Sequence, residues 1–89
     1  MVNMHDWTLI DITSHWRNRS VILRFSSQDG HKEILANNFS KVRVPRNNPW
    51  GASVSVNKAI LSNADKRLSI EMQSGDTIEI EAQSIELPE

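Results

Sequence analysis

The sequence predicts an all-β protein, and three observations lead to this fold class. Apolar and polar residues alternate along most of the chain, as they do in strands with one buried face. Turn-forming residues interrupt this alternation at short intervals. No long segment has the i, i+3, i+4, i+7 spacing of an amphipathic helix, and Asn57 to Ala64 is the best candidate for a single helical turn. We therefore expect a compact antiparallel sandwich or partly open barrel of seven to eight short strands.

Seven apolar runs define the expected strands. Within each run the apolar side chains share one parity, so they point to one face of a sheet. The segment from Gln83 to Leu87 is expected as a further edge strand, ended by Pro88. In chain order the seven runs are Ile10, Ile12 and Trp16; Val21, Leu23 and Phe25; Ile34 and Ala36; Val42 and Val44; Val54 and Val56; Leu68, Ile70 and Met72; and Ile78, Ile80 and Ala82.

Turn chemistry predicts three hairpins and their registers. A type I′ turn at Asp29-Gly30 would place Phe25 opposite Ile34. A similar two-residue turn at Asn18-Arg19 would place Ile12 opposite Phe25. In each case apolar side chains meet on the same face, so the turn and the apolar pattern agree.

A third hairpin is expected around the loop Ser74-Gly75-Asp76. With three loop residues, Ile70 pairs with Ile80 on the inner face. The same register places Glu71 opposite Glu79 on the outer face, where like charges destabilise a strand pair. A cation such as Arg67, solvent, a basic partner or a divalent ion would relieve this repulsion.

Composition limits the classes of protein to which the chain can belong. Its 89 residues form one domain (1–89), with residues 1–4 expected as a flexible N-terminal extension. The absence of cysteine excludes disulfides and thiolate zinc sites. There is no apolar run of about 18 residues that would span a membrane, and no secretion signal at the N-terminus. We therefore expect a cytoplasmic protein with no membrane partner and no cofactor.

The net charge is small, but the charged residues are unevenly distributed along the chain. The net charge of −1 argues against a nucleic-acid partner. Residues 1–46 contain seven Lys or Arg and four acids, a net of +3, whereas residues 47–89 contain three Lys or Arg and seven acids, a net of −4. We expect the two halves of the chain to pair with each other across a sheet.

Two groups of residues form the candidate binding surface. The first is the proline-bounded loop with Arg43, Arg46 and Trp50. Trp50 either covers the end of the core or, with the two arginines, forms a recognition corner for an anionic group, a sugar or a peptide. The second group is the acidic outer face, Glu71, Glu79 and Glu81.

No catalytic constellation is evident in the sequence. His5 and Asp6 are adjacent, and neighbouring residues on a strand point to opposite faces, so we expect their side chains to diverge. The three histidines, His5, His15 and His31, lack a metal-binding spacing. No serine lies in a nucleophile elbow. We therefore expect no enzymatic activity, no catalytic residue and no metal site.

Three segments resemble an uncharacterised family of small bacterial β proteins. They are His5-Asp6-Trp7, the string Pro-Trp-Gly-x-Ser-x-Ser-Val-Asn that ends at Asn57, and Ile-Glu-Met-Gln-Ser-Gly-Asp over residues 70–76. The resemblance implies a small β fold and no particular activity. The expected function is a non-enzymatic protein-interaction or binding module, of adaptor or immunity type. The alternative is a small-ligand or carbohydrate-binding domain that uses the Pro-Trp-Gly loop.

Overall fold

The computed structural model describes residues 4–45, 55–62, 64 and 66–88, and these residues form one antiparallel sheet. The all-β antiparallel class is therefore confirmed, but the described residues form six strands rather than seven or eight. They contain no helix, so none of them forms a membrane-spanning one. The strands are β1 (Thr8–His15), β2 (Ser20–Ser27), β3 (Gly30–Arg43), β4 (Val56–Ser62), β5 (Arg67–Met72) and β6 (Thr77–Glu86), in the sheet order β1-β2-β3-β6-β5-β4.

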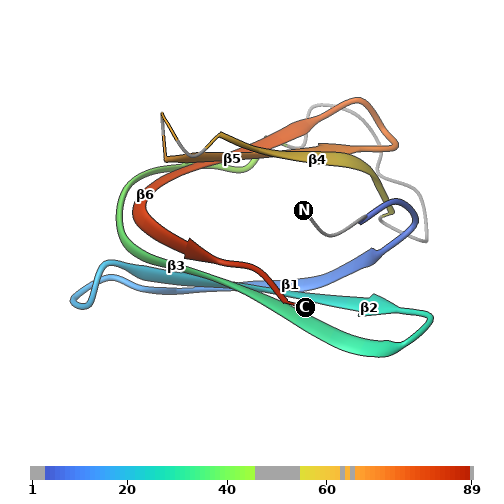
Figure 1. Ribbon diagram of the computed structural model, residues 1–89, viewed down its shortest axis with the longest axis horizontal. Helices are drawn as coiled ribbons and strands as arrows, with labels where there is room; N and C mark the ends of the chain where they lie inside the picture. Colours follow the sequence, from blue (N-terminus) through green and yellow to red (C-terminus); the bar gives the residue numbers. More distant parts are fainter. Residues whose placement is uncertain (1–3, 46–54, 63, 65, 89) are drawn as a thin grey trace.

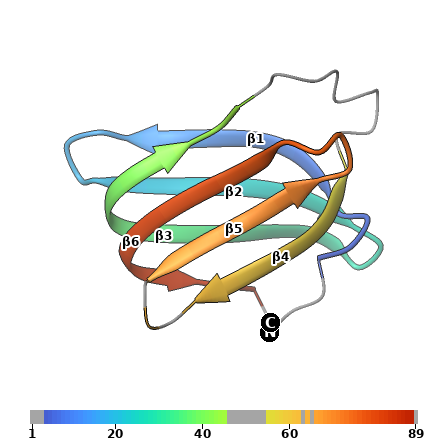
Figure 2. The same ribbon diagram turned by 90° about the horizontal axis from the view of Figure 1, so that it is seen from above.

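The sheet folds over into two layers because β3 and β6 are long and bent. Figure 1 shows both strands curving from one layer to the other at the same end of the molecule. The first part of β3 pairs with β2, and its second part pairs with β6. Seen from above in Figure 2, β4, β5 and β6 cross diagonally over β1, β2 and β3. The strand order is linear, so the sheet is not closed into a barrel.

A β-bulge, and not a turn, produces the bend of β3. The register with β6 shifts between Phe39 and Lys41, and Asn38 has a φ of 55°. Asparagine tolerates this left-handed conformation, and a bulge bends a strand without ending it. The runs at Ile34 and Val42, expected as two strands, therefore lie on the single strand β3.

Strand β6 likewise joins two expected strands. The run that begins at Ile78 continues through Gln83 to Glu86 without a turn. This strand lies in the middle of the sheet, between β3 and β5, so the expected edge strand at residues 83–87 is wrong. The helical turn expected from Asn57 is also wrong, because these residues pair with β5 as strand β4.

The two halves of the chain repeat the same three-stranded meander. The cross-strand pair Leu9–Phe25 recurs as Val56–Met72, with both partners 47 residues further along the chain. A bulge follows in each first strand, before Asp11 in β1 and before Lys58 in β4. The meanders β1-β2-β3 and β4-β5-β6 join through β3 and β6, which gives the sheet an approximate twofold symmetry.

All three hairpin registers differ from the predicted ones by two residues. In the first hairpin Leu23, not Phe25, lies opposite Ile34. The turn residues are Gln28 and Asp29, neither of which has a positive φ, and the following Gly30 has a φ of 111°. The other observed pairs are Ile12 with Leu23 and Ile70 with Ile78. Because side chains alternate with a period of two, a shift of two leaves the side chains of these pairs on their predicted face.

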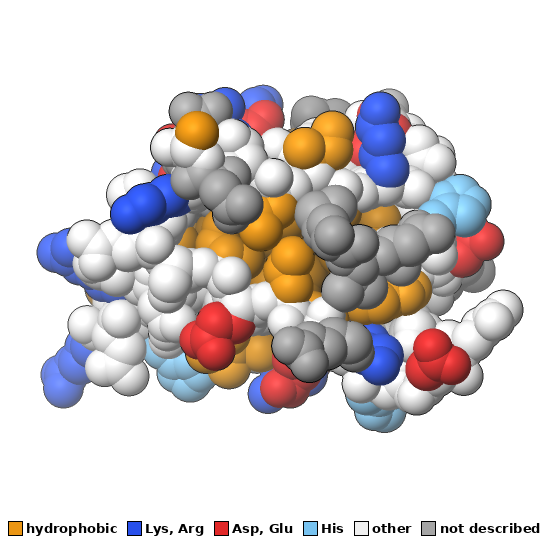
Figure 3. All heavy atoms as spheres, viewed as in Figure 1, with side chains coloured by type: hydrophobic (Ala, Val, Ile, Leu, Met, Phe, Trp, Pro, Cys, Tyr) orange, Lys and Arg blue, Asp and Glu red, His pale blue; other side chains and the backbone are white. Residues whose placement is uncertain are grey.

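The core lies between the two layers, where apolar atoms are visible at the centre of Figure 3. Phe25 and Leu23 are completely buried, and Trp7 packs against Phe25 with ring centroids 5.8 Å apart. Met4 is 3% exposed, so residue 4 belongs to the core and not to a flexible extension. The remaining fully buried large side chains are Val21, Ile34, Val56, Leu68, Ile70, Met72, Ile78 and Ile80.

Three residues assigned to the core by parity lie outside it: Ile10, Trp16 and Val44, which is 40% exposed just beyond the end of β3. Ile10 is 51% exposed because it is the extra residue of the β1 bulge, where the alternation of faces is interrupted. Trp16 is 80% exposed because β1 ends at His15 and the indole belongs to the turn that follows. The β1–β2 turn thus contains four residues, 16–19, instead of the predicted two.

We expect the bend of β3 to depend on the left-handed conformation of Asn38. Replacement of Asn38 by Val should lower the free energy of unfolding by about 1–2 kcal/mol, because a β-branched residue is strained at this φ. Replacement by Gly should be tolerated, since glycine adopts positive φ freely. Urea unfolding of both variants tests this, and equal stability of the two would contradict the role of the bulge.

Candidate functional site

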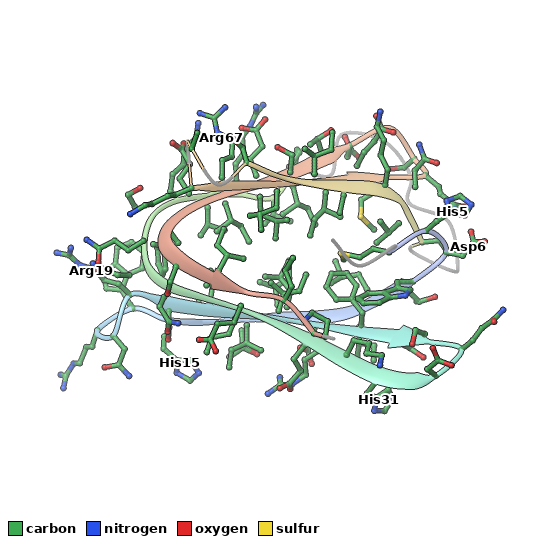
Figure 4. All side chains as sticks on the ribbon, in the orientation of Figure 1. His5, Asp6, His15, Arg19, His31 and Arg67 are labelled. Carbon is green, nitrogen blue, oxygen red and sulfur yellow. The ribbon has the colours of Figure 1, made fainter. Side chains whose placement is uncertain are left out.

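The outside of the bend forms a groove between the two layers. A cavity of about 340 Å³ lies there, at the end of the molecule where Arg19 is labelled in Figure 4. Several Lys and Arg side chains project from this end in Figure 3. The cavity is lined by Arg19, Asn38, Phe39, Ser40, Lys66, Glu81, Ala82 and Gln83. We call this surface the bend groove.

Two backbone hydrogen bonds fix the rims of the bend groove. The amide of Phe39 donates to the carbonyl of Arg19 (2.8 Å), and the amide of Ala82 donates to the carbonyl of Lys66 (3.1 Å). Arg19 and Lys66 each have a φ of 51°, and Phe39 lies directly opposite Ala82 in the sheet. The end of each hairpin is therefore tied to a bent strand, and one cationic residue stands on each rim.

A pair of aromatic residues lies at one end of the groove. Trp16 contacts Phe39 edge to face, with ring centroids 5.8 Å apart and an angle of 61° between the rings. Together with Arg19 and Ser40 these two residues line a cavity of about 410 Å³. Phe39 packs against the core, whereas Trp16 remains in solvent. A large exposed apolar side chain beside cations is typical of a binding surface.

The elements that form the groove carry an excess of positive charge. Among the described residues that line its cavities, together with their immediate chain neighbours, the basic ones are Arg17, Arg19, Lys41, Lys66 and Arg67, and the acidic ones are Glu81 and Glu86. The Glu81 carboxylate pairs with Arg67 Nη2 at 3.5 Å and with Lys41 Nζ at 3.8 Å. When Asp65 is also counted from the sequence, a net of two positive charges remains. The groove therefore favours negatively charged partners.

Each glutamate of the predicted acidic face has a cationic residue beside it, either as an ion pair or directly opposite in the sheet. Glu71, Glu79 and Glu81 are half-buried on β5 and β6, and Glu81 pairs with two cations as described above. The predicted pair of Glu71 with Glu79 is wrong, because the actual register places Ser69 opposite Glu79. Glu71 instead lies opposite Lys58 and accepts a hydrogen bond from Asn57.

The predicted arginine and tryptophan corner is described only in part. Arg43 is exposed at the end of β3, directly opposite Glu79 of the neighbouring strand β6. Arg46 and Trp50 lie outside the described residues. The structure thus gives Arg43 an acidic neighbour that was not evident from its own segment of the chain.

Most ion pairs of the described residues lie within one half of the chain, in contrast to the predicted pairing between halves. Arg24 on β2 bonds Glu33 on β3 at 2.9 Å and Asp11 on β1 at 3.2 Å. The hydrogen bond to Glu33, followed by that to Asp11, raises the pKa of Arg24 above its usual value. Only the pair of Lys41 with Glu81 joins the halves among the Lys and Arg pairs of the described residues.

The opposite end of the molecule contains a joint between the edge strands β1 and β4. The amide of Asp6 donates to the carbonyl of Val56 (2.9 Å), and the amide of Val56 donates to the carbonyl of Trp7 (2.8 Å). The side chain of Gln73 donates from Nε2 to Asp6 Oδ1 (2.7 Å). Described residues of the three segments used for the resemblance meet here, namely His5 to Trp7, Val56 with Asn57, and Gln73, so these residues have a structural role.

His5 and Asp6 belong to this joint, and the predicted divergence of their side chains is wrong. Asp6 has a φ of 67° within a turn closed by a hydrogen bond from Trp7 N to Met4 O (3.0 Å), so the two side chains are not on a strand. His5 Nε2 lies 3.5 Å from Asp6 Oδ2. His5 Nδ1 donates to the carbonyl of Asn57 (2.8 Å), because a carbonyl only accepts. Figure 4 shows this pair at the end of the molecule opposite Arg19.

The shallow cavity beside this joint holds no activated nucleophile among its described residues. It measures about 220 Å³ and includes His5, Asp6 and Ser27 in its lining. Ser27 Oγ donates to the carbonyl of Gly30 (2.9 Å) and accepts from the amide of Asp29 (3.2 Å), which engages it in the hairpin turn. Nowhere in the described part of the chain do three or more His, Asp or Glu side chains gather in a way that would hold a metal ion.

No protein-family model, no curated protein and no solved structure matches this chain. The functional interpretation therefore depends on the geometry of the described residues. The bend groove was not predicted, because Trp16 shares its parity with Ile10 and Ile12 and was assigned to the inner face. The sequence did contain a signal that Trp16 is exposed, because Trp16 precedes the polar residues Arg17, Asn18 and Arg19, and the four together can form a turn.

We expect the Gln73 side chain to stabilise the joint between β1 and β4. Replacement of Gln73 by Ala removes the hydrogen bonds to Asp6 Oδ1 and to the carbonyl of Val56, and should lower the free energy of unfolding by about 1 kcal/mol. The exposed Gln28, in the first hairpin turn, provides a control as Gln28→Ala. Amide hydrogen exchange at Val56 should accelerate in the first variant only, and unchanged exchange there would contradict the role of Gln73.

Proposed function

We propose that this protein is a non-enzymatic protein-interaction module that binds its partner in the bend groove. The exposure of Trp16 carries the proposal. The indole is 80% exposed, is held edge-on by Phe39, and lies beside Arg19. Tryptophan and arginine supply most of the binding energy at many protein interfaces, because they combine a large contact area with directed hydrogen bonds.

The hydrogen bonds of His5 and Ser27 support a binding function and not a catalytic one. His5 Nδ1 donates to the carbonyl of Asn57 and Nε2 lies 3.5 Å from Asp6 Oδ2, so both ring nitrogens have partners within the joint. The Ser27 hydroxyl, which lines the same cavity, is held by its own turn. These groups stabilise the fold and leave the bend groove as the surface with unused contact area.

The adaptor or immunity type of module is consistent with this arrangement. Such proteins act by covering a surface of their partner, which requires a rigid scaffold and a few anchoring side chains. Trp16 is anchored to the scaffold through Phe39, and the carbonyl of Arg19 is bonded to the same residue. The anchors therefore need little ordering when a partner binds.

The test is the dependence of binding on Trp16. Peptides of roughly twelve residues are selected from a displayed random library on the immobilised protein, and their affinity is measured by fluorescence anisotropy. We expect Trp16→Ala to weaken binding by about 30-fold, or about 2 kcal/mol, without lowering the urea midpoint.

The matched control is Ile10→Ala, which removes an exposed apolar side chain outside the groove. This variant should keep the parent affinity. Failure to select any peptide, or equal binding by the Trp16→Ala variant, would exclude the bend groove as the binding surface.

A further inference from the structure

We infer that the bend groove takes an extended acidic segment of a partner protein, with one apolar side chain of that segment at each end of the groove. This inference rests on the proposed function and specifies the chemistry of the partner. Besides the aromatic end at Trp16, the groove has a second, aliphatic end that includes Leu61 and Ile85. That end is a cavity of about 270 Å³, lined by Leu61, Lys66, Ala82, Gln83, Ser84 and Ile85.

The two ends correspond to each other through the internal repeat. Arg19 and Lys66 are 47 residues apart, the same interval that relates the first two strands of each meander. Both have a φ of 51°, and their carbonyls bond the facing residues Phe39 and Ala82. A hollow forms on each side, where a hairpin end meets a bent strand. The repeat therefore provides two subsites of similar backbone geometry.

The subsites are continuous through the central cavity. That cavity shares Arg19, Phe39 and Ser40 with the aromatic end, and it shares Lys66, Ala82 and Gln83 with the aliphatic end. The result is a groove with apolar surface at both ends and a cation on each rim between them. A partner that matches this pattern has apolar side chains at its two ends and acidic residues in the middle.

The size of the molecule limits the length of the bound segment. The groove crosses one end of the longest axis, and the two other extents of the molecule are 29 and 24 Å. An extended chain advances about 3.3 Å per residue, so these extents limit the bound segment to about seven to nine residues. This is enough for two apolar side chains separated by a short acidic stretch.

A peptide fits the groove better than a single-stranded nucleic acid does. The Glu81 carboxylate lines the central cavity and can accept hydrogen bonds from the backbone N–H groups of a peptide, whereas a sugar-phosphate backbone has no such donors at its phosphates. Nucleic-acid grooves use several aromatic side chains for stacking, and among the described residues only Trp16 and Phe39 offer rings here. The aliphatic end also favours a side chain over a charged sugar-phosphate backbone.

The experiment uses matched variants on the two rims and a block at the aliphatic end. Arg19→Gly and Lys66→Gly each remove one cation while glycine retains the positive φ. Ser84→Phe fills the second cavity from an exposed position on β6. Peptides selected as above are the probes, and we expect about fivefold weaker binding for each glycine variant and about tenfold for Ser84→Phe. Urea midpoints verify that each variant is folded.

Substitutions in the peptide then show which apolar residue of the peptide binds at which end of the groove. Replacing one apolar residue of the peptide by Ala should have no further effect on the Trp16→Ala variant. Replacing the other should have no further effect on the Ser84→Phe variant. This pattern would demonstrate two separate subsites, because each protein change removes the contact of only one peptide side chain.

Other outcomes would overturn the inference in distinguishable ways. If Trp16→Ala weakens binding but Lys66→Gly and Ser84→Phe do not, the two-ended groove is wrong and the proposed function stands. If Trp16→Ala has no effect, both are wrong. Selected peptides without acidic residues, or tighter binding of an oligodeoxythymidylate of similar length, would exclude an acidic peptide as the occupant.

Discussion

The pairing of β3 with β6 is the interaction on which the rest of the structure depends. Each strand belongs to a different meander, and each passes from one layer to the other. The two layers bury Leu23, Phe25 and Ile70 because these strands bend where they meet. A bulge provides the bend, since it adds a residue to one strand without breaking the hydrogen-bonded ladder on either side.

This arrangement gives the two ends of the molecule different roles. At one end the sheet edges are fastened by backbone bonds among Asp6, Trp7 and Val56, with Gln73 reinforcing them. An open sheet exposes two edges, and such a joint protects part of both. At the other end the bent strands cover the core, and the residues outside the bend face solvent. Trp16 therefore remains exposed without cost to the core.

The contrast between Trp7 and Trp16 shows how position determines the role of a side chain. Trp7 is buried against Phe25 and fills the end of the core. Trp16 is one residue beyond the end of β1 and contacts Phe39 from outside. Both indoles contact a phenylalanine at the same centroid distance, 5.8 Å. Only the first contributes to the core, and the second leaves most of its surface exposed to solvent.

The sequence by itself determined the class of the fold and the inner face of most strands. Every second position from Val21 to Phe25 is apolar, and side chains at every second position of a strand point to the same face. The burial of Val21, Leu23 and Phe25 was therefore predictable. The sequence did not determine where β1 ends, because Trp16 continues the every-second-residue pattern of Ile10 and Ile12 although it lies in the turn. Nor did it determine that Ile34 and Val42 lie on one strand, because a bulge and a turn both interrupt the apolar alternation and cannot be distinguished by it.

Only the tertiary structure decided the registers and the candidate site. A register that is shifted by two residues keeps the same faces, so the apolar pattern is satisfied by both choices, and backbone contacts select one. The selected register separates Glu71 from Glu79 and brings Lys41 and Arg67 to Glu81. The bend groove depends on residues far apart in the chain, and its geometry follows from packing between layers, which no local pattern encodes.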